Sequence, residues 1–201
     1  MEFSAEVRKR IDLLHQDCID DSDKQLILTE KCKQGAAELQ LDLQYRCILF
    51  KNLDKHKLGY FKNEKCADYI VFENIDKSWF LHIFELKRTV TNSKWEEDIK
   101  DQFRGAMQNA LAIAGFMGIS IELSKTRLYT AYRYDKINDV ANPVKLRTGL
   151  HEKGSERTQT KESDWDDEKV KIDFLETEYL QHIRVQLDIE DGRGRVKLST
   201  E

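Results

Sequence analysis

Three charged side chains stand where an isolated charge would be costly. Asp68 opens an apolar run that continues to Phe72, and Glu85 and Lys87 interrupt the end of a second apolar run that begins at Trp79. Residues two apart in a strand share a face, so Glu85 and Lys87 project the same way. Two neighbouring carboxylates repel each other unless a proton, a cationic side chain or a divalent metal relieves the repulsion. Hard oxygen ligands favour Mg²⁺ or Mn²⁺, and a lysine beside such a metal can hold a water or stabilise charge on a phosphate.

The two apolar runs predict a β-hairpin that brings these charges together. Residues 68–72 and 79–86 are rich in the aromatic and β-branched types that strands prefer, and a polar turn separates them. Asp68 and Glu85 then lie at the same end of the hairpin. The second run has the composition of a central strand buried on both faces. A solvated cluster of cross-strand salt bridges is the alternative, and it would contribute little stability.

The pattern of Asp68 followed by Glu85-x-Lys87 resembles the core motif of the PD-(D/E)xK nuclease superfamily, which shares the restriction-endonuclease-like fold. The resemblance implies that Asp68 and Glu85 bind Mg²⁺, with Mn²⁺ as a substitute, and that Lys87 assists the attacking water. It covers about residues 30–134, and the family's proline before the aspartate is Ala67 here. The implied activity is phosphodiester hydrolysis in nucleic acid, foremost by a DNA endonuclease of restriction, repair or phage defence.

The same resemblance points to further residues. Members often add a carboxylate from the first core helix, for which Glu30 and Glu38 are the candidates, and we favour Glu38 as a metal ligand because it lies closer to the next strand. Gln102 lies on the apolar side of the following helix, where related nucleases sometimes place a glutamine near the active site. The tyrosine that those proteins carry four residues later is Ala106 here. Surface or boundary positions are the alternative interpretation of these polar residues.

Basic residues on and after the second strand are candidates for contacts with phosphate. Arg88, Lys94 and Arg104 would bind nucleic acid, because phosphate contacts provide most of the sequence-independent affinity. Acidic residues 96–98 are interleaved with them, so a solvated helix face with ion pairs one turn apart is an equal alternative. We interpret His82, on the opposite face from Glu85, as a core or edge histidine rather than a ligand.

Composition limits these hypotheses. The chain has 201 residues, of which 33 are basic and 37 acidic, so its formal net charge is −4 and nucleic-acid binding would need a local basic patch. Four scattered cysteines lack zinc-ligand spacing and predict reduced thiols. The N-terminus lacks the apolar core of a signal peptide, and no run approaches the roughly 20 apolar residues that cross a bilayer. We therefore expect a cytoplasmic protein without a membrane segment.

The elements that must position the site follow from apolar spacing. Helices are predicted over Ser4–Cys18 and from about Asp23 to Leu39, and strands over Tyr45–Phe50 and Leu123–Tyr134. Between the hairpin and the last of these strands lies the clearest helix, with a capping box and two glycines that close it. Its members are Ser93 and Glu96 of the capping box, Trp95, Ile99, Phe103, Ala106, Ala110 and Ala114 of the apolar stripe, and Gly115 and Gly118.

The C-terminal third gives weaker signals. Asn142–Pro143 predicts a turn, and residues 148–169 predict a polar loop. Residues 173–182 predict a short helix. Residues 183–198 predict a closing hairpin with its turn over residues 190–194.

Together these patterns predict one α/β domain over residues 1–201, with a mixed central sheet flanked by helices and a nuclease-like core over about 24–135. To cut both strands of a duplex, a protein of this size would pair as a homodimer. Two alternatives stay open: a catalytically inactive nuclease-fold subunit that binds nucleic acid or serves assembly, and an acidic interaction protein of a phage or defence system. A response of thermal stability to metal would separate a nuclease from a docking protein.

Overall fold

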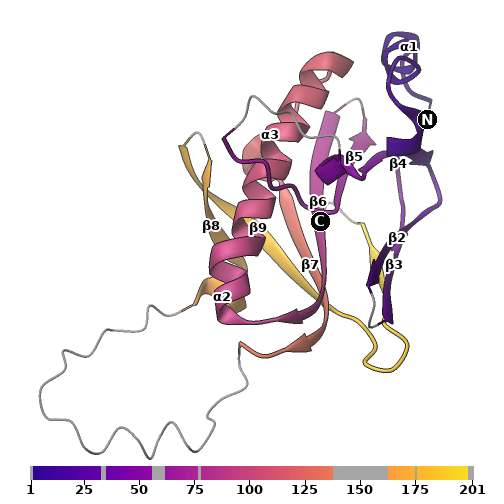
Figure 1. The fold of residues 1–201 in the computed structure, drawn as a ribbon. Coiled ribbons are helices and arrows are strands. Elements are labelled where there is room, and N and C mark those ends of the chain that lie inside the picture. Colours follow the sequence, from indigo (N-terminus) through magenta and orange to yellow (C-terminus); the bar gives the residue numbers. More distant parts are fainter. Residues whose placement is uncertain are drawn as a thin grey trace, which may run out of the picture.

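The computed structural model describes residues 2–32, 35–55, 62–76, 78–137, 163–174 and 176–198. Its longer helical elements are α1 (Ala5–Ile11), α2 (Asn92–Lys94), a π-helical turn (Trp95–Ile99) and α3 (Lys100–Met117), the last three following one another directly (Figure 1). Short 3-10 turns lie at Gln16–Cys18, Leu53–Lys55, Leu123–Lys125 and Asp164–Asp166. Its strands are β1 (Ile19–Ser22), β2 (Gln25–Cys32), β3 (Gly35–Asp42), β4 (Arg46–Lys51), β5 (Tyr69–Ile75), β6 (Ser78–Val90), β7 (Arg127–Asp135), β8 (Lys169–Phe174), β9 (Glu176–Gln186) and β10 (Arg193–Lys197).

Seven strands form one mixed sheet in the order β1-β4-β5-β6-β7-β9-β8. β6 runs parallel to β7 and β7 parallel to β9, whereas the other neighbouring strands are antiparallel. Parallel neighbours need a crossover connection, and α3 lies in the one between β6 and β7. The predicted α/β class is therefore confirmed, together with the β5–β6 hairpin, the strand at β4 and the long helix.

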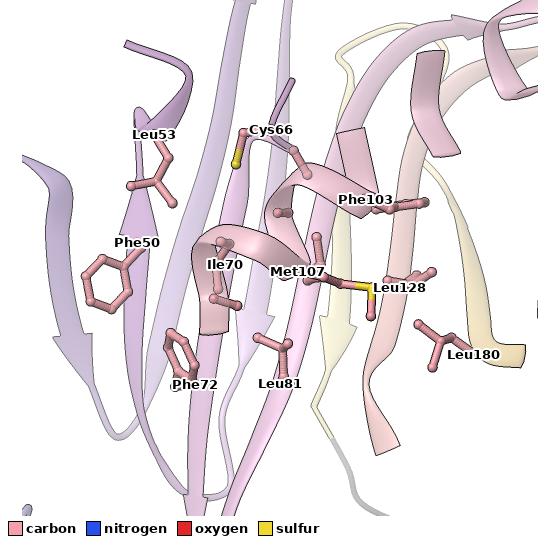
Figure 2. Packing of buried hydrophobic residues seen from close by; sticks show 14 of the residues in the cluster. Phe50, Leu53, Cys66, Ile70, Phe72, Leu81, Phe103, Met107, Leu128 and Leu180 are labelled. Carbon is pink, nitrogen blue, oxygen red and sulfur yellow. The ribbon is translucent and has the colours of Figure 1, made fainter. Parts of the chain in front are cut away.

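Both faces of this sheet are buried. On one face α1 and α3 pack against the strands, and Figure 2 shows Phe103 and Met107 of α3 close to Ile70, Leu81 and Leu128. On the other face lies a second sheet, in the order β10-β3-β2, whose leucines share a core with β4 to β7 and β9. Central strands covered on both sides need apolar residues on both faces, which explains the long apolar runs of β5 and β6.

The predicted helix from Asp23 to Leu39 is wrong, because this stretch forms the antiparallel pair β2 and β3. Leu26 and Leu28 alternate with exposed or half-buried residues, and Leu28 lies opposite Leu39 in the ladder. These leucines are buried against the large sheet. The abundance of Leu, Glu, Lys, Gln and Ala, which favour helices in isolation, concealed a period of two.

Two predictions for the C-terminal region are also wrong. Residues 173–182 form strand rather than helix and lie in β8 and β9, which pair antiparallel. The predicted closing hairpin over 183–198 does not form, because β9 pairs parallel with β7 while β10 pairs parallel with β3 in the second sheet. The Asn142–Pro143 turn and most of the predicted loop over 148–169 lie outside the described residues.

The first helix is much shorter than predicted, and the long helical segment begins with a different cap. The helix predicted over Ser4–Cys18 ends at Ile11. The long helical segment is capped by Thr91 rather than Ser93, because the Thr91 hydroxyl accepts a hydrogen bond from an amide of the first turn at 3.3 Å. It ends as predicted at Gly118, which has a φ of 68° that glycine adopts without strain.

Residues 163–166 cover the outer edge of β8. The Asp164 carboxylate accepts a hydrogen bond from the Lys171 amide at 3.3 Å, and it also binds Trp95 Nε1 at 2.8 Å and Lys100 Nζ at 2.7 Å. An edge strand exposes unpaired backbone groups. Asp164 therefore takes one of those groups and ties the edge of the sheet to the helical segment.

Candidate active site

Asp68 and Glu85 interlock at the open end of the β5–β6 hairpin. The ladder pairs Tyr69 with Phe84, which places Asp68 opposite Glu85 on the face that α3 covers. The Asp68 amide donates to Glu85 Oε2 at 3.2 Å, and the Leu86 amide donates to Asp68 Oδ2 at 2.8 Å. Each carboxylate is thus held by the backbone of the other residue's strand, as the predicted hairpin requires.

Glu85 lies in a surrounding that disfavours its charge. Its side chain is fully buried, and this burial, with the nearby charge of Asp68, raises its pKa to about 8. Lys87 forms an ion pair with Glu85 Oε1 and opposes that rise. Burial by itself would lower the pKa of Lys87, but Glu85, Asp68 and Asp98 outweigh it and hold the pKa above its usual value. Among the described residues, the cluster therefore brings together the two carboxylates of Asp68 and Glu85 and the ammonium of Lys87.

Gln102 is also brought to the cluster. Its backbone carbonyl accepts a hydrogen bond from the Ala67 amide at 3.1 Å, next to Asp68 in the chain. The side-chain Oε1 is buried and has no hydrogen-bond partner among the described residues. Because a buried amide oxygen without a partner is costly, it marks a place where a water or ligand would be stabilised.

Glu30 and Glu38 are the candidates for a third carboxylate, and the structure places Glu30 near the cluster rather than Glu38. Glu30 shares its strand face with Leu28, toward the large sheet, whereas Glu38 alternates with the buried Leu39 and faces away, where it pairs with Arg193 at 3.7 Å. Burial, and next the charge of Asp68, raises the pKa of Glu30, while Lys87 and Lys94 oppose the rise. The preference for Glu38 depended on the helix that does not form, and we correct it.

Tyr69 explains how the second sheet brings Glu30 to the cluster. The Tyr69 hydroxyl accepts from the Thr29 amide at 2.9 Å and donates to the Thr29 carbonyl at 2.7 Å. It thereby ties the edge of β2 to the residue that follows Asp68. Sequence reasoning missed this contact because β2 was interpreted as a helix, and a lone tyrosine in an apolar strand gives no signal of such a role.

The three predicted nucleic-acid contacts do not lie together. Lys94 donates to the Thr89 carbonyl at 3.2 Å and acts electrostatically on Glu30, so it lies beside the cluster. Arg88 follows Lys87 in β6 and stacks 5.9 Å from the Tyr134 ring. Arg104 instead pairs with Asp101 at 2.8 Å and lines a polar hollow between α3 and β8. Lys94 stays a candidate at this site, whereas Arg88 alternates with Lys87 and projects from the opposite face of β6, and Arg104 belongs to a different surface.

His82 lies in the core, as the sequence suggests. Its Nε2 is 3.0 Å from Glu73 Oε2, and its Nδ1 is 3.5 Å from the Tyr129 hydroxyl. His82 and Glu73 are both buried in the sheet. This pair faces away from α3 and takes no part in the Asp68–Glu85 cluster.

The donor set of the cluster consists of hard oxygens. Asp68 and Glu85 supply two carboxylates whose repulsion a divalent cation would relieve, which is the chemistry that Mg²⁺ and Mn²⁺ need. Within the described ranges, no three Asp, Glu, His or Cys side chains converge in a metal-binding group. A cation here would therefore rely on two side chains together with backbone oxygen or water, as Mg²⁺ sites commonly do.

Comparisons with protein-family models, with curated proteins and with solved structures find no match to this chain. Among the described residues, no helix has the length and apolar character that crossing a membrane requires.

Proposed function

We propose that this chain is a Mg²⁺-dependent nuclease of the PD-(D/E)xK type that hydrolyses phosphodiester bonds, foremost as a DNA endonuclease. The interlocked pair of Asp68 and Glu85, with Lys87 bound to it, carries the proposal. The order β4, β5, β6, α3, β7 supports it, since an antiparallel hairpin followed by a helical crossover to a parallel strand is the arrangement expected of a restriction-endonuclease-like core.

Asp68 and Glu85 would hold the metal, and Glu30 is the candidate for a further carboxylate. A bound divalent cation supplies a Lewis acid that polarises a phosphate and lowers the pKa of a water. Binding it would displace the proton that Glu85 retains near neutral pH because of its raised pKa. Metal affinity should therefore strengthen as the pH rises toward 8.

Lys87 is placed to act on the nucleophile and on the phosphate. Its ammonium keeps its proton because Glu85 and Asp68 raise its pKa, so it donates hydrogen bonds and does not serve as a base. A fixed cation at this point would orient a water and offset the negative charge that develops on the phosphate.

Nucleic acid would approach from the side of Lys94, which lies beside the cluster at the start of the helical segment. Cleavage of both strands of a duplex would need two copies of the site, so we include a homodimer in the proposal.

The test is cleavage of supercoiled plasmid, linear duplex, single-stranded DNA and RNA with Mg²⁺, with Mn²⁺ and with chelator. The Lys87→Ala variant should lose at least about a hundredfold in rate, the usual effect of removing one group that stabilises developing charge. Lys171→Ala is the matched control, because it also removes a strand lysine paired with a carboxylate two residues away, at 3.5 Å in that case. It should keep the native rate. A chain that cleaves none of the four substrates and whose melting temperature ignores metal would overturn the proposal.

A further inference from the structure

The segment before Asp68 lies along the helical segment and is fastened to it at several points. Asn63 Nδ2 donates to the Asp101 carbonyl at 2.9 Å, and the Ala67 amide donates to the Gln102 carbonyl at 3.1 Å. Lys65 Nζ donates to the Glu97 carbonyl at 2.9 Å, and it pairs with Asp98 at 3.1 Å and with Asp101 at 3.7 Å. Residues 63–67 are irregular in structure, so these contacts take the place of a sheet ladder.

Gly105 makes this close approach possible. A Cβ atom added at Gly105 would lie 1.7 Å from the Lys65 carbonyl oxygen, far inside any allowed contact. Asn109 Nδ2, one turn later in α3, donates to the Gly105 carbonyl at 2.9 Å and to Cys66 Sγ at 3.7 Å. Cys66 is buried beside the helix, as Figure 2 shows. Only a residue without a side chain at position 105 allows the two backbones to meet.

The position of Asp68 depends on this fastening. Asp68 follows Ala67 directly, and it is held in the sheet by two hydrogen bonds with Glu85 and the Leu86 amide. The Lys65–Asp98 ion pair also affects the electrostatics of the cluster. Asp98 is paired with Lys65, and its charge also helps to raise the pKa of Lys87. Releasing Lys65 would leave Asp98 to compete with Glu85 for the ammonium of Lys87.

We propose that residues 63–67 form a strap, a segment held along the helical segment by these contacts, that fixes the position of Asp68 relative to Glu85. Gly105 and Lys65 are its positioning residues. The inference rests on the proposed metal-dependent function for its catalytic meaning, but the strap itself can be tested without any activity. Weakening the contacts of the strap should lower metal affinity and speed hydrogen exchange of the Leu86 amide, which donates to Asp68, while the chain stays folded.

Gly105→Ala tests the strap, with Gly115→Ala as its control. Both replace a glycine of α3 with a better helix former, but a Cβ at Gly115 meets nothing within 4 Å. Gly115→Ala should raise the melting temperature and leave the half-saturating Mn²⁺ concentration unchanged. Gly105→Ala should raise that concentration at least tenfold, measured by thermal shift, and should speed hydrogen exchange of the Leu86 amide at least tenfold. Unchanged values of both quantities in Gly105→Ala would overturn the proposal.

Lys65 provides a second variant, in case Gly105→Ala does not fold. The Lys65 side chain is partly exposed, so Lys65→Ala should fold with a similar melting temperature yet show the same weaker metal response and faster Leu86 exchange. Lys65→Arg, which keeps the charge and the donors, should restore both. Failure of Lys65→Ala to change either quantity would contradict the strap. If the native chain ignores metal while Leu86 exchange still depends on Lys65, the proposed function fails and the strap stands.

Discussion

The two ends of the β5–β6 hairpin both bury acidic side chains, and they differ in how the charge is matched. Toward the turn, Glu73 Oε2 lies 3.0 Å from His82 Nε2, and neither side chain exposes more than 1% of its surface. At the open end, Glu85 is equally buried but lies against a second carboxylate, Asp68, with Lys87 as the one cation bound to it there.

This difference separates a structural pair from a candidate site. Glu73 Oε2 is paired with His82, although the buried Oε1 of Glu73 has no hydrogen-bond partner among the described residues. Asp68 and Glu85 are held together by backbone hydrogen bonds although their charges repel, and that arrangement is stabilised by a further cation. Burial of a charge alone does not mark a site, whereas an excess of one charge held at a fixed place does.

The largest expected effect is on the free energy of unfolding, at the Glu73–His82 pair. His82→Ala leaves Glu73 buried without its partner and should lower the free energy of unfolding by about 3–5 kcal/mol, the usual cost of breaking a buried pair. Lys87→Ala should cost much less, because Lys87 is partly exposed and Glu85 can take up a proton. Urea unfolding at pH 7 without metal measures both. Equal costs for the two variants would remove the distinction between the two ends.

The next largest effect is on metal-dependent activity, at the open end of the hairpin where Asp68 and Glu85 lie. Glu85→Gln should lower cleavage about a hundredfold, or about 2.7 kcal/mol of barrier, and should abolish the rise in melting temperature with Mn²⁺. Glu73→Gln replaces an equally buried glutamate on the same hairpin and should leave the metal response intact. A loss of metal response in Glu73→Gln, compared at temperatures where both variants are folded, would show that the two ends act together.

A third effect is the dependence of stability on pH. Burial raises the pKa of Glu85 to about 8 from 4.5, so between these values the folded state binds more protons and stability falls as the pH rises. Burial lowers the pKa of His182, packed beneath Trp95, to about 3 from 6.5, so between those values stability rises with pH. The two slopes oppose each other from pH 4.5 to 6.5, and of these two groups only Glu85 contributes from pH 6.5 to 8.

The free energy of unfolding should therefore fall by about 2 kcal/mol from pH 6.5 to 8, at about 1.4 kcal/mol per pH unit. Glu85→Gln should remove that fall, which urea unfolding across the pH series without metal would measure. A native chain with constant stability over this range would mean that Glu85 is already ionised at pH 6.5 and that its negative charge is compensated within the folded protein.

The smallest effect concerns the third carboxylate. Glu30→Gln should raise the half-saturating metal concentration several-fold, a change of about 1 kcal/mol, because Glu30 adds to the negative charge near Asp68. Glu38→Gln is the control, since that side chain faces away and pairs with Arg193. A larger effect from Glu38 than from Glu30 would require the second sheet to move when metal binds.

The sequence was informative where residue types and periodicity agreed. The β5–β6 hairpin has aromatic and β-branched runs with a polar turn, and its register follows from them, so Asp68 and Glu85 meet as predicted. The helix up to Gly118 was equally clear because its apolar spacing and its terminal glycine agree. Here local preference and tertiary packing favour the same structure.

The second sheet was not predicted because the residue types of β2 and β3 concealed their period of two and because their packing partners in the large sheet and in β10 are distant in the chain. β2 and β3 carry residues that favour helices, and they become strands by burying Leu28 and Leu39 against the large sheet. β3 then pairs with β10, more than a hundred residues later. The position of Glu30 and the tie through Tyr69 depend on that packing, so they had no signal in the sequence.

The Asp164 carboxylate that covers β8 limits how copies of this protein can assemble. An uncovered outer strand can extend its ladder into a neighbouring molecule, giving either a continuous intermolecular sheet or an aggregate. Asp164 already occupies the Lys171 amide and is itself held by Trp95 and Lys100. Strand addition at this edge would first have to displace Asp164 from the Lys171 amide. The homodimer proposed above is therefore expected to use a surface other than the outer edge of β8.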